Sequence, residues 1–288
     1  MPNLTKRRKR TERQVLTKPI CLTERDESVL KAIYEYRVLS QVQISRFIFQ
    51  GKATVAQRRL RLYDGKYLDR RFQLKEAGIL ASPILYLLDK TGNDYLIKYH
   101  AFSEKRWTAK RKKVGYGHLE HLLEVNDFRM TFTLGCQYKG FTLENWIDDM
   151  SFHKSYDTVA VEGYETPVAV QPDGYAVLRT SQHKQLHFFV ELDRGTETVG
   201  EKFKKKMAAY HTYFKSSHIL KRFSTKEIRV LIVAHSEKRA HNLKKITEKI
   251  GGKSRYWFAT LPELTPENIF NEPVWNKAGH SEKTTLIY

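Results

Sequence analysis

The sequence has few cysteines and no long apolar run. Its 288 residues include two cysteines, Cys21 and Cys136. They lie far apart and form no C-x-x-C pair, so neither a disulfide framework nor a cysteine zinc site is expected. No apolar stretch approaches the ~20 residues of a membrane helix, and the basic N-terminus lacks the apolar segment of a secretory signal. These absences predict a cytoplasmic protein with reduced thiols and no membrane partner.

Several nucleotide-binding and hydrolase motifs are also missing. The chain contains no P-loop, no G-x-S-x-G and no G-x-G-x-x-G, which argues against an ATPase, a serine hydrolase and a Rossmann dehydrogenase. Its content of 41% hydrophobic and 12% aromatic residues is sufficient for folded cores. The length accommodates two domains.

Acidic residues are scarce in the first part of the chain. Residues 1–115 hold 27 basic and 11 acidic side chains, whereas residues 116–288 hold 24 and 21. Most of the net charge of +19 therefore lies in the first part. This asymmetry predicts a module that binds double-stranded DNA, joined to a second module with another task. A cationic surface that only aids solubility is the alternative.

The first part has the element order of a winged helix-turn-helix. Residues 1–20 are expected to form a basic arm, and residues 21–102 the domain itself. Apolar spacing predicts three helices, the first capped by Thr23, the second starting near Gln41 and the third running from about Ala53 to Asp64. Two strands and a closing helix follow. A helical bundle with a polar third helix is the alternative.

The third helix has one face suited to reading DNA bases. Arginine, glutamine and threonine side chains recur along it at helical spacing, and these residue types pair with base edges in the major groove. In a winged helix the last of three helices enters that groove. The predicted DNA-binding residues, including two arginines of the first hairpin strand, are Thr54, Gln57, Arg58, Arg61, Arg70 and Arg71.

The second part has the alternation of an α/β domain. Residues 103–117 are expected to be a basic linker, residues 118–264 the domain, and residues 265–288 a C-terminal tail. The expected order from His118 is α-β-β-β-α-β-α-β, which forms layers around a small mixed sheet. The chain as a whole is therefore expected to be mixed α/β.

Three acids stand near the ends of two of these strands. Asp173 follows a proline, and Glu191 and Asp193 are two residues apart, so they share one face of their strand. Antiparallel pairing would bring Asp173 beside Glu191, with Glu124 or Asp127 of the preceding helix as a third candidate. Clustered carboxylates favour a hard cation such as Mg²⁺. The alternative is a capped hairpin with solvated polar ends.

The segments "QPDGYAVL" and "FFVELD" resemble the P-D and E-x-K elements of the PD-(D/E)XK, or restriction-endonuclease-like, nucleases. The resemblance covers about residues 117–264. It implies that Asp173 and Glu191 are catalytic and bind Mg²⁺ or Mn²⁺, with Glu124 as a further ligand. Asp193 stands where the family has its lysine, and an Asp193–Arg194 ion pair would indicate an inactive site. The following helix offers Lys206, and Lys206-x-x-x-Tyr210 resembles a helix signature of the recombination-repair branch.

The whole layout resembles the replication-relaxation proteins of plasmids and conjugative elements. The matching segments are "HLLEVND" (121–127), "PDGY" (172–175) and "ELDRGTE" (191–197). The resemblance implies a role in replication, mobilisation or its control. Together with the basic first part and the lysine missing at Asp193, it favours a DNA-binding protein with a degenerate nuclease-like domain. An active metal-dependent endonuclease is the second hypothesis and a transcriptional repressor the third. Further candidate partners are a second copy of the chain and other proteins of the mobile element.

Overall fold

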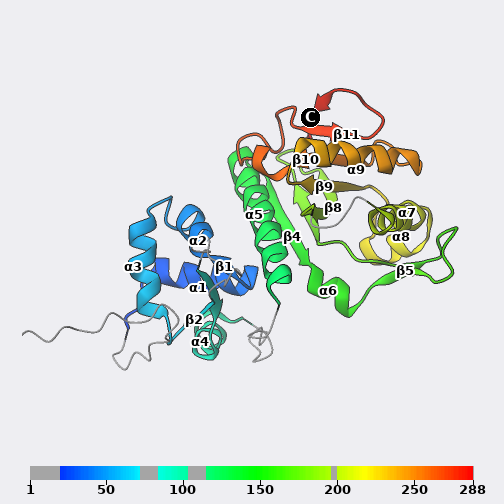
Figure 1. Cartoon of the computed structure of the whole chain (residues 1–288). Coiled ribbons are helices and arrows are strands. Elements are labelled where there is room, and N and C mark those ends of the chain that lie inside the picture. The colour runs from blue at the N-terminus through cyan, green and yellow to red at the C-terminus, as the bar shows by residue number, and fades with distance from the viewer. Residues whose placement is uncertain (1–19, 72–83, 103–114, 196–199, 288) are drawn as a thin grey trace, which may run out of the picture. The chain divides into compact units, whose positions relative to one another are not determined.

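The computed structural model describes residues 20–71, 84–102, 115–195 and 200–287. The chain divides into two compact units, Met1–Asn126 and Asp127–Tyr288, which are shown in Figure 1. The expected basic arm, except for Ile20, and most of the expected linker lie outside the described residues. The expected mixed α/β class is confirmed.

The first unit combines helices with a small antiparallel sheet. In its described residues the strands are ordered β1-β3-β2. The three helices, the two strands and the closing helix that the sequence predicts are all present among the described residues, and the short strand β1 is an addition. The elements are α1 (Glu24–Tyr36), β1 (Leu39–Ser40), α2 (Gln41–Phe47), α3 (Ala53–Tyr63), β2 (Leu68–Arg71), β3 (Leu85–Leu88) and α4 (Lys90–His100).

Capping residues fix where the first two helices begin. The Thr23 backbone N–H donates to Asp26 Oδ2 at 2.9 Å, which completes a capping box at the start of α1. Ser40 and Gln43 form the same arrangement at the start of α2. Each box satisfies backbone donors that a helix start leaves without partners.

The start of helix α5 (Tyr116–Lys139) belongs to the first unit. Leu119 and Leu122 are buried in one apolar cluster with Val38 and Leu85. The Asn126 side-chain amide donates to the Val38 carbonyl at 2.8 Å. The division between the units therefore falls within α5, later in the chain than the boundary expected before residue 118.

The second unit is built on a mixed sheet with the order β12-β11-β10-β9-β8-β7-β4 in its described residues. Strands β8, β9 and β10 are parallel, and the other pairs are antiparallel. The elements after α5 are β4 (Thr142–Asp148), α6 (Asp149–Lys154), β5 (Asp157–Val159), β6 (Val168–Val170), β7 (Gly174–Arg179), β8 (Gln185–Asp193), α7 (Glu201–Lys215), α8 (His218–Phe223), β9 (Ile228–Ala234), α9 (Glu237–Lys249), β10 (Tyr256–Thr260), the 3-10 turn η2 (Leu261–Glu263), β11 (Trp275–Lys277) and β12 (Lys283–Thr284).

Helices cover both faces of this sheet (Figure 1). Successive side chains of a strand point to opposite faces, and adjacent phenylalanines of β8 show this directly. The Phe188 ring packs 5.6 Å from that of Phe132 on α5, whereas the Phe189 ring packs 5.5 Å from that of Tyr210 on α7. Leu243 of α9 is buried in the same cluster as Phe189. Side chains that share the face of Phe189 therefore point toward α7 and α9.

The segment "VAVQPDGYAVLR" (168–179) is typical of one strand, but the structure divides it into two. Val168–Val170 pairs with Asp157–Val159 in a separate two-stranded sheet, and β7 begins only at Gly174. Pro172 lies in the break. A proline has no N–H for a strand ladder, which is the physical reason that the strand is interrupted there.

The expectation of a C-terminal tail over residues 265–288 is also corrected, because residues 265–287 complete the sheet. They supply β11 and β12, and Ile269, Phe270 and Trp275 are buried. The Trp275 indole N–H donates to the Ile269 carbonyl at 2.8 Å. These two strands have only three and two residues, too few to produce a recognisable hydrophobic period.

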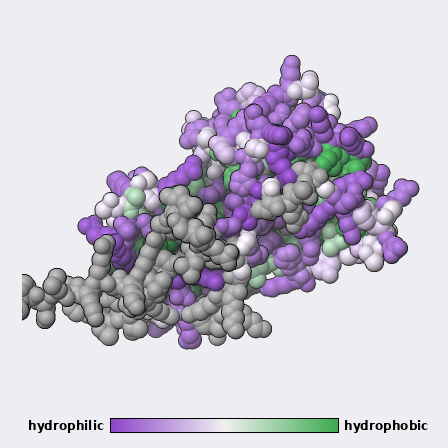
Figure 2. Space-filling model, viewed as in Figure 1, coloured by the Kyte–Doolittle hydropathy of each residue, from purple (hydrophilic) through white to green (hydrophobic). Residues whose placement is uncertain are grey.

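Hydrophilic residues dominate the visible surface of the described residues (Figure 2). Among those residues, no helix combines the length and the apolar composition that crossing a membrane requires.

Candidate functional site

Strand pairing places Asp173 beside Glu191. Asp173 directly precedes β7, and its backbone N–H donates to the Val190 carbonyl at 3.0 Å. Its side chain is fixed as well, because Asp173 Oδ2 accepts the Leu192 N–H at 2.8 Å. The two bonds bracket Glu191 on β8. Two predicted acids, 18 positions apart in the sequence, thus lie at neighbouring strand ends.

Glu191 is buried against α7, with 6% of its surface exposed. It shares the strand face of Phe189 and contacts two side chains of that helix. Its Oε2 contacts the Lys206 ammonium, and its Oε1 accepts the Tyr210 hydroxyl. Lys206 and Tyr210 are four residues apart, so they lie on one side of the helix. The structure therefore brings three predicted catalytic residues, Asp173, Glu191 and Lys206, into one cluster, which we call the carboxylate–lysine site.

The charges of this cluster are strongly coupled. Burial raises the pKa of Glu191 to about 7, and the Asp173 carboxylate adds to this rise while the Lys206 ammonium opposes it. Burial acts to lower the pKa of Lys206, but the Glu191 and Asp173 carboxylates outweigh it, so the pKa is raised. Burial also raises the pKa of Tyr210. At neutral pH, Lys206 is therefore an ammonium and Tyr210 a neutral hydroxyl.

Asp193 has a different partner from the one expected. Its carboxylate accepts two hydrogen bonds from the Arg239 guanidinium, at 2.7 and 2.9 Å. The sequence had suggested Arg194 for this ion pair. Asp193 lies on the same strand face as Glu191, and this face packs against α7 and α9. Arg239 is a residue of α9. Position 193, where the sequence resemblance to PD-(D/E)XK nucleases led us to expect a lysine, is thus occupied by a bidentate ion pair between β8 and α9.

The donor set of the site fits a hard divalent cation. Asp173 and Glu191 offer carboxylate oxygens, and Mg²⁺ takes one or two carboxylates with waters. The rise that Asp173 causes in the Glu191 pKa shows that their charges repel at close range. Glu124, the third predicted ligand, lies on the part of α5 that belongs to the first unit. Within the described ranges, no group of three or more His, Cys, Asp or Glu residues is arranged to hold a metal.

A glycine next to Asp173 allows a tryptophan to pack closely. A Cβ atom at Gly174 would lie 2.6 Å from the ring of Trp146 on β4, closer than atoms can approach. The Trp146 ring also packs 5.4 Å from the Arg129 guanidinium on α5. Sequence reasoning missed the close packing of the Trp146 ring against Gly174. The glycine in "PDGY" was its one visible signal.

The predicted DNA-reading face of α3 is accessible. Thr54, Arg58 and Arg61 are exposed, and Gln57 is partly exposed. The opposite side of the helix is buried and consists of Ala56, Leu60 and Tyr63. The helix is therefore two-faced as expected, and the role of its exposed face in DNA binding stays a prediction.

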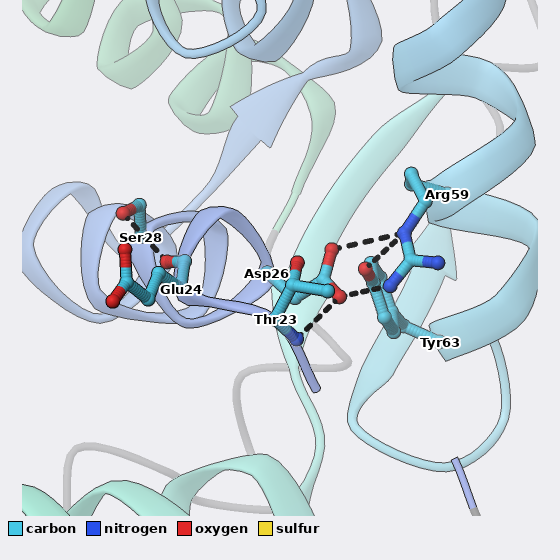
Figure 3. A network of polar contacts seen from close by, with 6 residues as sticks. All are labelled: Thr23, Glu24, Asp26, Ser28, Arg59 and Tyr63. Atoms are coloured by element: carbon cyan, nitrogen blue, oxygen red, sulfur yellow. Dashed lines mark hydrogen bonds and ion pairs between the residues drawn. The ribbon is translucent and has the colours of Figure 1, made fainter. Parts of the chain in front are cut away.

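A different arginine anchors α3 from its inner side (Figure 3). The Arg59 guanidinium donates to both carboxylate oxygens of Asp26 and to the Tyr63 hydroxyl. Asp26 is 1% exposed and also closes the capping box of α1. Arg59 therefore ties α3 to the start of α1, which fixes the direction in which Arg58 and Arg61 point.

The two arginines predicted on the first hairpin strand lie at β2. The Arg70 guanidinium pairs with Asp64 at 2.7 Å, and its side chain is only 13% exposed. This pair joins β2 to the end of α3 and gives Arg70 a structural role. Arg71 ends the strand and is partly exposed.

Comparison with known families gave a match to the family described as replication-relaxation, over residues 30–226. Comparison with curated proteins and with solved structures gave no match.

Proposed function

Because the chain belongs to the replication-relaxation family, whose match spans more than half of it, we propose that it acts on the DNA of a plasmid or another mobile element. The family indicates a role in replication or mobilisation. In this proposal the first unit is a winged helix that binds duplex DNA. The second unit is a restriction-endonuclease-like domain that cleaves one or both strands with a divalent cation.

The contact between Lys206 and Glu191, beside Asp173, carries this proposal. A nuclease of this kind needs two acids and a lysine at one place. The sequence lacks the lysine at position 193, and α7 supplies one from another direction. Lys206 reaches the same carboxylate from the helix that follows the strand, which supports a relocated rather than a missing lysine.

The chemistry follows from the charges of the site. Asp173 and Glu191 would hold Mg²⁺ or Mn²⁺, which activates water and neutralises charge on a phosphate under attack. Lys206 remains protonated, because its pKa is raised. It therefore serves to stabilise negative charge on the phosphate and does not remove a proton from water. Tyr210 and Lys206 together hold the Glu191 carboxylate in place.

The first unit supports the DNA-binding part of the proposal. Its three helices are followed by antiparallel strands, in the order of a winged helix. Thr54, Arg58 and Arg61 project from the third helix, with Arg59 holding it from behind.

A supercoiled-plasmid assay with Mg²⁺ and with Mn²⁺ tests the proposed cleavage. We expect the wild-type protein to nick or linearise the plasmid and Glu191→Gln to abolish this while retaining DNA binding. Glu144→Gln is the matched control, because Glu144 lies on the same sheet but pairs with Arg179 outside the site. No cleavage by the wild type with either metal would refute a nuclease.

A DNA-binding protein with an inactive second unit is the second candidate. It is favoured by the occupation of both Glu191 oxygens by Lys206 and Tyr210, and by the Asp193–Arg239 pair at the usual lysine position. In that case a gel shift would show specific binding, the plasmid would stay supercoiled, and Glu191→Gln would behave as the wild type.

A further inference from the structure

The outward face of α9 carries an uncompensated row of cations. At 100° per residue, Lys238, Lys245 and Lys249 point in one direction, with His241 and Asn242 between them. All five side chains are exposed. The buried residues of α9, which are Ala240, Leu243 and Thr247, lie on the opposite side. We call Lys238, Lys245 and Lys249 the α9 lysine face.

The acids of α9 are used elsewhere and do not neutralise this face. Glu237 pairs with Lys283 at 3.4 Å. Glu248 pairs with Lys244 at 2.9 Å and accepts the Gly279 N–H at 2.8 Å. In the described part of the chain, no carboxylate forms an ion pair with Lys238, Lys245 or Lys249.

The row works against the stability of the helix that carries it. Lys245 and Lys249 are four residues apart, and like charges at this spacing repel. The positive charge is also concentrated locally. Helices α7 and α9 together hold ten basic and three acidic residues, whereas residues 116–288 are nearly balanced at 24 and 21. A surface kept only for solubility would mix the two signs, so this face fits a polyanionic partner.

The face begins next to the carboxylate–lysine site. Lys238 is adjacent to Arg239, whose guanidinium holds Asp193 on the same strand face as Glu191. From Lys238 to Lys249 the helix rises about 16 Å, which matches about five nucleotides along one strand of duplex DNA. If a DNA duplex bound along α9, the phosphates that contact Lys238 would therefore lie beside the predicted catalytic residues.

We propose that the α9 lysine face binds the phosphate backbone of double-stranded DNA, as a second DNA contact separate from α3. This inference rests on the proposed function, in which the substrate is DNA. The contact is independent of base sequence, because lysines on an exposed helix face meet phosphates and not base edges. It positions the backbone for the site, while the first unit selects the sequence.

A binding experiment compares the full chain with Lys245→Gln/Lys249→Gln on a short duplex that lacks any specific site, over a series of salt concentrations. We expect the affinity of the double variant to fall about tenfold at moderate salt. The slope of log K against log salt should fall by about 2, because each lysine that neutralises a phosphate contributes roughly 0.9 to it. Lys154→Gln/Lys184→Gln, which removes two exposed lysines elsewhere in the second unit, should leave both quantities unchanged.

The binding and unfolding measurements distinguish a failure of the α9 contact from a failure of the proposed function. Thermal unfolding should show that Lys245→Gln/Lys249→Gln is as stable as the wild type, because a repulsive pair is removed. If the wild type and this variant bind with equal affinity and slope, the α9 contact is refuted while the proposed function stands. If the wild type binds no DNA at any salt concentration, both the contact and the proposed function are refuted.

Discussion

Lys206 Nζ contacts Glu191 Oε2 although 15 positions separate the two residues in the sequence. The first residue lies on a helix and the second on the strand before it, and residues 196–199 between them lie outside the described ranges. This contact joins an acid that sequence reasoning could find to one of the four lysines in "KFKKK" (202–206).

Glu191 should make the protein less stable as the pH rises through the acidic range. Its folded-state pKa of about 7 lies above the ordinary value of 4.5, so the folded state holds a proton that the unfolded state has released. The stabilisation is complete below pH 4.5 and is lost as the pH rises to about 7, with a total of about 3 kcal/mol. Urea unfolding at several pH values should show this decline in the wild type, and Glu191→Gln should remove it. An unchanged decline in the variant would show that another group is responsible.

Lys206→Met should cost more stability than the loss of an exposed lysine. The substitution leaves the buried Glu191 carboxylate without its cation, although Lys206 is one-third exposed and the effect is moderated by solvent. At pH 8 we expect a loss of about 1–3 kcal/mol in the free energy of unfolding. Lys204→Met is the control on the same helix, because its pair with Glu201 is exposed and should contribute less than about 1 kcal/mol. Equal losses would argue against a coupled pair.

Gly174→Ala should destabilise the second unit. The new methyl group would lie 2.6 Å from the Trp146 ring, and such overpacking typically costs about 1–3 kcal/mol. Gly117→Ala serves as a control, since its Cβ would meet nothing within 4 Å. Thermal unfolding of Gly174→Ala with Trp146→Leu should recover part of the loss, because the smaller side chain vacates the space. No recovery would mean that Trp146 is not the cause.

Three arginines of α3 should affect different properties: Arg58 and Arg61 the binding of DNA, and Arg59 the free energy of unfolding. Arg58→Ala and Arg61→Ala should each weaken specific DNA binding by about 1–3 kcal/mol if they read bases, with unfolding unchanged. Arg59→Ala should instead destabilise the first unit by about 2–4 kcal/mol, because Asp26 is left buried without its cation. Gel shifts and thermal unfolding separate the two effects. Unimpaired binding by Arg58→Ala/Arg61→Ala would contradict the assignment of α3.

Local pattern predicted most of the long elements. Apolar spacing placed α1 and α3, and the capping residue Thr23 marked the start of α1, because these signals act within a few residues. Elements that depend on distant partners were missed. The strands β11 and β12 are short and exist because Tyr256–Thr260 and its neighbours offer a free sheet edge. Pro172 was visible in the sequence, but neither the interruption of the strand nor the separate sheet of Asp157–Val159 and Val168–Val170 was predicted.

Residue types and short spacings were enough to establish the charge asymmetry, the two-faced third helix, the strand-end acids Asp173 and Glu191, and the resemblance to a known family. The packed fold was needed to establish that Lys206, and not a residue at 193, reaches Glu191, and that Arg239, and not Arg194, holds Asp193. Both contacts depend on how helices α7 and α9 pack on the face of β8, and packing geometry is set by the whole core rather than by local sequence.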